Sequence, residues 1–83
     1  MPVTCTLRVL LARLNLHRAE RGESPLSLRR LAAESGISLS VIVALHGGRS
    51  QRVDFATLDR LLRYFSTALD VGIDDLLGWE PAA

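Results

Sequence analysis

Residues 27–48 have the sequence SLRRLAAESGISLSVIVALHGG, and this stretch decides the fold. Ser27 is a favourable N-cap, because its hydroxyl can accept a hydrogen bond from the free amides of the next turn. Gly36 tolerates the left-handed conformation that ends many helices. The pattern then repeats with Ser38 as a second N-cap. The stretch therefore predicts two short helices, over 28–35 and 39–46, joined by a three-residue turn.

Small and apolar residues lie where two crossing helices would touch. Ala32 lies where a larger side chain would push the helices apart, and Gly36 lies in the turn. Ile42 and Leu45 are spaced to point inward beside Leu31. These are the steric requirements for two helices that cross at the steep angle of a DNA-binding helix-turn-helix. We therefore expect residues 27–48 to form a helix-turn-helix core.

Helical periodicity continues on both sides of this core. Leucines at helical spacing predict a first helix from near Thr4 to Arg21. Asp54 is expected to cap a fourth helix, and residues 73–77 to form a short fifth one. The buried stripe of the fourth helix is predicted to consist of Phe55, Leu58, Leu62, Phe65 and Leu69. With no alternating strand pattern, the predicted fold class is all-α, a compact bundle of five short helices in a single domain over residues 1–83.

Composition limits the classes of protein that fit. The chain has 83 residues, 48% hydrophobic and 23% charged, which is typical of a small soluble domain. It has no apolar run of the roughly 20 residues that a membrane helix needs, and no secretion signal is recognisable at its N-terminus. The single cysteine, Cys5, cannot form an internal disulfide. A cytoplasmic protein with no membrane partner is therefore expected.

The sequence has no catalytic or metal-binding pattern with structural support. His17 and His46 have no cysteine or carboxylate partner at ligand spacing, so no metal site is expected. Asp74 and Asp75 lie at a predicted helix start, where acidic residues interact favourably with the helix dipole. No nucleophile–base arrangement or phosphate-binding loop is evident. The sequence therefore predicts no enzyme, no cofactor and no small-molecule substrate.

The net charge of +1 hides an uneven distribution. Residues 1–52 hold eight arginines and three acidic residues, whereas residues 53–83 hold two arginines and six acidic residues. A basic half of this kind can meet a polyanion, although a chance asymmetry on a solvated surface is the alternative.

With these features the chain resembles the Cro/repressor-like, or XRE-type, helix-turn-helix proteins, whose fold is that of the lambda-repressor-like DNA-binding domains. The resemblance runs from Ser27 to Leu77. It is carried by Leu31-Ala32, Gly36-Ile37-Ser38, Ile42, Leu45, Gly48, Thr57-Leu58 and the tail over residues 68–77. It implies double-stranded DNA as the partner, a homodimer, and a role as a sequence-specific transcriptional regulator, with repression as the expected effect.

The resemblance also implies which residues contact DNA. The third helix would enter the major groove and the second would lie across the backbone. The implied base-reading positions are Ser38, Leu39, Ser40, Val43 and Ala44. Phosphates would be met by Arg29, Arg30, Arg49, Ser50, Gln51 and Arg52, which position the protein without specifying sequence.

The chain departs from the family on the face expected to contact bases. Leu28 stands where the family usually has Gln, and residues 46–48 read His-Gly-Gly where Glu-Asn-Gly is common. The third helix offers no Arg, Gln or Asn for bidentate recognition, although its apolar side chains can contact thymine methyl groups. The alternative function is a protein-interaction module, such as an antitoxin-like partner, that uses this apolar helix.

The C-terminal group Leu76, Leu77 and Trp79 has two possible roles. These residues either complete the core under the first helix or form a dimer patch. Both possibilities remain open from the sequence.

Overall fold

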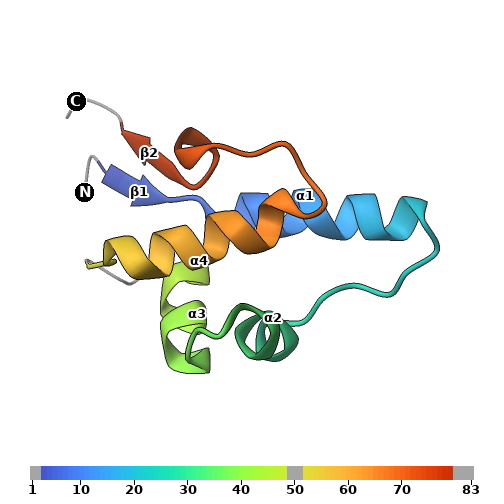
Figure 1. Cartoon of the computed structure of the whole chain (residues 1–83), viewed down its shortest axis with the longest axis horizontal. Helices are drawn as coiled ribbons and strands as arrows, with labels where there is room; N and C mark the ends of the chain where they lie inside the picture. Colours follow the sequence, from blue (N-terminus) through green and yellow to red (C-terminus); the bar gives the residue numbers. More distant parts are fainter. Residues whose placement is uncertain (1–2, 49–51, 80–83) are drawn as a thin grey trace.

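The computed structural model describes residues 3–48 and 52–79. These residues form four α-helices, one 3-10 helix and a two-stranded sheet. The elements in chain order are β1 (Val3–Cys5), α1 (Leu7–Glu20), α2 (Leu28–Ser35), α3 (Leu39–His46), α4 (Phe55–Ser66), η1 (Ile73–Asp75) and β2 (Leu77–Trp79). In Figure 1, α1 and α4 extend along the long axis, α2 and α3 lie on one side of them, and the sheet lies beside the two termini.

The two central helices have the bounds that the sequence predicts. The Ser27 hydroxyl accepts a hydrogen bond from the Arg30 backbone N–H at 3.1 Å, which fixes the start of α2. Gly36 ends α2 with a φ of 75°, a left-handed conformation that disfavours any side chain. Its N–H donates to the Ala32 carbonyl oxygen at 3.1 Å. Local capping chemistry thus sets the length of α2 and the turn that leads into α3.

The caps of α2 and α3 differ, and this gives a matched pair of substitutions. Ser38 lies at the N-cap position of α3, but its side chain makes no capping hydrogen bond. We expect Ser27→Ala to lower the free energy of unfolding by about 1 kcal/mol, because an N–H of α2 loses its acceptor. Ser38→Ala should change it by less than about 0.5 kcal/mol. Urea titration followed by circular dichroism measures both values, and an equal loss in the two variants would contradict this account.

The predictions of an all-α fold and of a first helix from Thr4 are wrong. Residues Val3–Cys5 form a strand that pairs antiparallel with Leu77–Trp79, with Val3 opposite Trp79 and Cys5 opposite Leu77. Thr6 secures this start of the chain, because its N–H donates to the Leu76 carbonyl at 2.7 Å and its hydroxyl to the Asp75 carbonyl at 2.8 Å. Strands of three residues are too short to show alternation in a sequence, so only the pairing of distant segments reveals them.

The predicted fifth helix over residues 73–77 is also wrong in type and extent. It is a 3-10 helix of three residues, Ile73–Asp75, and Leu77 already belongs to β2. The Asp75 carboxylate accepts a hydrogen bond from the Gly72 N–H at 2.8 Å. Asp75 therefore acts as a local cap, and the chain turns from η1 directly into the strand.

The core is formed by residues from every α-helix and from the segments between them. Fully buried side chains are Phe65, Leu7, Leu10, Leu31, Ile42, Leu45, Leu61 and Leu76. In α4 the buried stripe is Leu58, Leu61 and Phe65. The prediction that Phe55 belongs to this stripe is wrong, since Phe55 is the first residue of α4 and is 88% exposed.

The three C-terminal apolar residues do not share one role. Leu76 is completely buried, so it completes the core, and Leu77 is partly buried against it. Trp79 is 68% exposed and lies outside the core. In the part of the chain that is described, no helix has the length and apolar character needed to span a membrane.

Candidate nucleic-acid interface

Helix α3 presents one side to the core and the other to solvent. Ile42 and Leu45 are buried, as predicted. Of the predicted base-reading residues, Ser38 at the N-cap and Ser40 and Val43 on the helix are exposed, whereas Leu39 and Ala44 are half-buried. Three of the five predicted base-reading residues therefore lie on an open surface of the helix, and Leu39 also packs against the core.

Two serine hydroxyls lie together at the exposed start of α3. The Ser38 and Ser40 Oγ atoms are 3.4 Å apart, and either can be the donor. Neither hydroxyl is used to cap the helix. Because a serine hydroxyl both donates and accepts, this pair can interact with several base edges or with a phosphate oxygen.

The crossing of α2 and α3 depends on a small side chain and on a contact from α4. Ala32 is 7% exposed at the contact between the helices, which is where the sequence requires a small residue. The Arg60 guanidinium of α4 donates to the Gly36 carbonyl oxygen at 2.9 Å. This contact joins residues 24 positions apart and fixes the turn, and no feature of the sequence identified Arg60 as its source.

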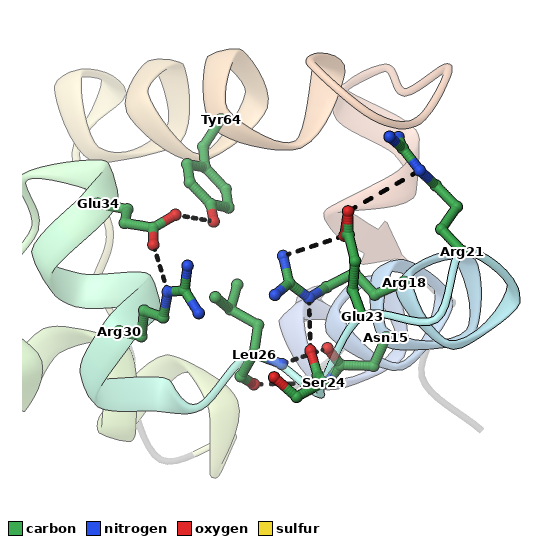
Figure 2. A network of polar contacts seen from close by, with 9 residues as sticks. All are labelled: Asn15, Arg18, Arg21, Glu23, Ser24, Leu26, Arg30, Glu34 and Tyr64. Carbon is green, nitrogen blue, oxygen red and sulfur yellow. Dashed lines mark hydrogen bonds and ion pairs between the residues drawn. The ribbon is translucent and has the colours of Figure 1, made fainter.

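Polar side chains of α1 hold the segment that precedes α2 (Figure 2). The Asn15 side chain accepts a hydrogen bond from the Leu26 N–H at 2.7 Å and donates to the Leu26 carbonyl at 3.4 Å. The Arg18 guanidinium donates to the Ser24 carbonyl at 2.8 Å. These side chains form hydrogen bonds with backbone N–H and C=O groups that lie outside the helices and strands. They thereby hold the chain so that α2 can begin after Ser27.

The two arginines at the start of α2 have different surroundings. Both are exposed, but the Arg30 guanidinium donates to the Glu34 carboxylate at 2.5 Å. The other oxygen of Glu34 accepts from the Tyr64 hydroxyl of α4 at 2.7 Å, so Arg30 is turned toward α4 (Figure 2). Arg29 makes no ion pair within the described residues. Sequence reasoning predicted both arginines as phosphate contacts. The four-residue spacing of Arg30 and Glu34 was the signal that could have indicated their ion pair.

Tyr64 is the only tyrosine of the chain, so its ionisation can be followed directly. Partial burial, and then the hydrogen bond to Glu34, raise the pKa of Tyr64 from 10.0 to about 12. We expect absorbance at 295 nm to report this raised pKa in the folded protein, and Glu34→Gln to lower it. Since the folded pKa is above the unfolded one, the stability that this contact provides is present below pH 10 and is lost as the pH rises toward 12. A Tyr64 that titrates near 10 in the folded chain would contradict the contact.

The other basic residues are divided between structural contacts and open surface. Arg13 pairs with Asp75 at 3.0 Å, Arg18 with Glu23 at 3.7 Å and Arg21 with Glu23 at 3.9 Å. Arg52 is exposed at the start of the segment that leads into α4. The predicted phosphate contacts Arg49, Ser50 and Gln51 lie outside the described residues.

Two short helices joined by a glycine turn, the second with an open outer face, define a helix-turn-helix DNA-binding domain. The chain belongs to the Cro/C1-type HTH DNA-binding domain family, whose model matches residues 6–82. This membership supports a DNA-binding regulator and confirms the resemblance on which the sequence-based interpretation rests. No curated protein and no solved structure was found to match the chain.

Proposed function

We propose that this protein is a sequence-specific transcriptional regulator, a small repressor that binds double-stranded DNA as a homodimer and contacts bases through α3. The whole chain would act as a single domain over residues 1–83. The observation that supports this most directly is the open outer face of α3, with Ser38, Ser40 and Val43 exposed in a chain of the Cro/C1-type family. In this class of domain, the N-terminal part of the second helix contacts base edges in the major groove.

The proposed contacts divide into base-reading and phosphate-binding groups. Bases would be contacted by Ser38, Leu39, Ser40, Val43 and Ala44, and phosphates by Arg29, Arg30, Arg49, Ser50, Gln51 and Arg52. With no bidentate side chain on α3, specificity would come from thymine methyl groups and from hydroxyl contacts. Such a surface favours sites rich in A·T pairs, and the arginines would provide affinity at any sequence.

Fluorescence anisotropy with labelled duplexes of mixed sequence tests DNA binding. We expect binding at low salt that weakens steeply as salt is added, because several phosphate contacts release counterions. The combined variant Arg49→Ala, Arg52→Ala should bind more weakly at every salt concentration. Absence of binding at low salt, or no effect of these two substitutions, would overturn the proposal. Selection of bound duplexes from random DNA then gives the preferred sequence.

The different surroundings of Arg29 and Arg30 give a sharper test of the phosphate contacts. Arg29→Ala should weaken binding to all duplexes alike and reduce the slope of log K against log salt by about 0.9, which is one phosphate contact. Arg30→Ala should reduce the slope by less, because Glu34 already holds its guanidinium. Anisotropy titrations at four salt concentrations measure both slopes. A larger effect of Arg30→Ala than of Arg29→Ala would contradict this assignment.

A second candidate function rests on the apolar surface of α3. Val41 and Val43 are 38% and 36% exposed, and an exposed apolar helix face is typical of a protein-binding surface. In that case α3 would contact a protein partner, as an antitoxin does. Leu39→Asp or Val43→Asp would then abolish a protein complex and leave DNA affinity unchanged. Light scattering and pull-down, alongside anisotropy, separate the two functions.

A further inference from the structure

Helix α1 carries two apolar stripes, and only one of them is used by the fold. Leu7, Leu10, Leu11 and Leu14 are buried in the core. A second stripe, which we call the outer stripe, is formed by Val9, Ala12, Leu16 and Ala19. All four of these residues are exposed, with Val9 at 58% and Leu16 at 65%. A surface helix normally carries polar residues on the face opposite the core, so the outer stripe is an unusual apolar surface that a partner could cover.

The spacing of the outer stripe is that of a helix-pairing seam. Its residues are separated by three, four and three positions, which is the repeat of the apolar positions in a two-stranded coiled coil. The branched residues, Val9 and Leu16, alternate with the small residues Ala12 and Ala19. Small side chains let two helices approach closely, and larger ones fill the space beside them.

We propose that the outer stripe is the dimer interface of this protein, with α1 packed antiparallel on α1 of a second copy. This inference deepens the proposed function, because it assigns the surface of the homodimer. Reversing the stripe against itself places Val9 opposite Ala19 and Leu16 opposite Ala12. Each of these pairs then joins a large side chain to a small one. A two-fold interface needs such self-complementarity, because the same surface of both copies must fit together. A parallel pairing would instead place Ala12 on Ala12 and leave a gap.

The helix dipoles favour the same orientation. Parallel pairing would set the like-charged ends of the two dipoles together. The antiparallel arrangement places the positive end of each helix dipole beside the negative end of the other.

Analytical ultracentrifugation of the full chain tests the interface. We expect a reversible dimer with a dissociation constant on the order of micromolar, because a single helix pair is a small interface. Leu16→Glu should raise this constant about tenfold or more, since a carboxylate would be buried without a partner. Leu16 is 65% exposed in one copy, so the variant should fold normally by circular dichroism. Phe55→Glu is the matched control, because it adds the same charge at another exposed apolar position.

Disulfide trapping tests the orientation in a Cys5→Ser background. Oxidation of an equal mixture of Ala12→Cys and Leu16→Cys should yield the mixed disulfide, because only antiparallel pairing sets these positions opposite each other within bonding distance. A dominant Leu16→Cys homodimer would overturn the orientation. A monomeric wild type, or a dimer unaffected by Leu16→Glu, would overturn the interface. A dimer that binds no DNA would support the interface and contradict the proposed function.

Discussion

Replacing Phe65 with alanine is expected to lower the free energy of unfolding by about 3–5 kcal/mol. Phe65 of α4 is completely buried in the hydrophobic core, and its ring meets that of Tyr64 edge-on with 5.6 Å between the centroids. Truncation to alanine leaves a cavity that the surrounding leucines fill only in part. Small domains have only about 5–15 kcal/mol of stability, so much of the total would be lost. Urea titration followed by circular dichroism measures this change.

The only other phenylalanine of the chain provides the control. Phe55 lies on the same helix but is 88% exposed, so Phe55→Ala should change the free energy of unfolding by no more than about 0.5 kcal/mol. This contrast separates the burial of Phe65 from any general effect of removing an aromatic ring. A comparable loss of stability in the two variants would contradict the burial of Phe65 and the exposure of Phe55 on α4.

Val43→Asp is expected to weaken DNA binding by roughly ten- to hundredfold. Val43 is 36% exposed on the outer face of α3 and is a proposed base contact. An aspartate there would replace an apolar contact with a negative charge close to phosphates and to the base acceptors of the groove. Since the side chain is not part of the core, the fold should be retained. Anisotropy with the duplex obtained by selection measures the change.

The control for Val43→Asp is Ile73→Asp, which makes the same change in charge at an exposed apolar residue of η1. Its DNA affinity should fall by less than about threefold, because only the net charge changes. Equal affinity of wild type and Val43→Asp would contradict base contact by α3. If Val43→Asp then also lost a protein partner, the second candidate function would take the place of the first.

The helix-turn-helix was predictable because its determinants are local. Ser27 and Gly36 act within a few residues of their own positions, so the bounds of α2 and α3 follow from the order of the residues. Ala32, Ile42 and Leu45 follow from helical periodicity, and the structure confirms that all three are buried. Capping and periodicity need no knowledge of distant segments.

The features that sequence reasoning missed depend on segments far apart in the chain. The pairing of β1 with β2 joins residues at the two ends of the described chain, and Arg60 reaches the turn of the helix-turn-helix from α4. In α4, helical spacing alone could not show whether Leu61 or Leu62 is buried, because both fit an apolar stripe. Packing against the other helices buries Leu61 and leaves Leu62 only partly buried. The roles of Glu34 and Tyr64 beside Arg30 were missed for the same reason.

The short sheet also has a consequence for how the chain acquires its structure. The helices α2 and α3 follow each other directly, so the contacts between them can form while the rest of the protein is still being synthesised. Strand β1 is made first but must wait for β2, whose residues follow more than seventy positions later, before its amides find acceptors. The helix-turn-helix can therefore assemble before the two ends of the described chain pair as β1 and β2.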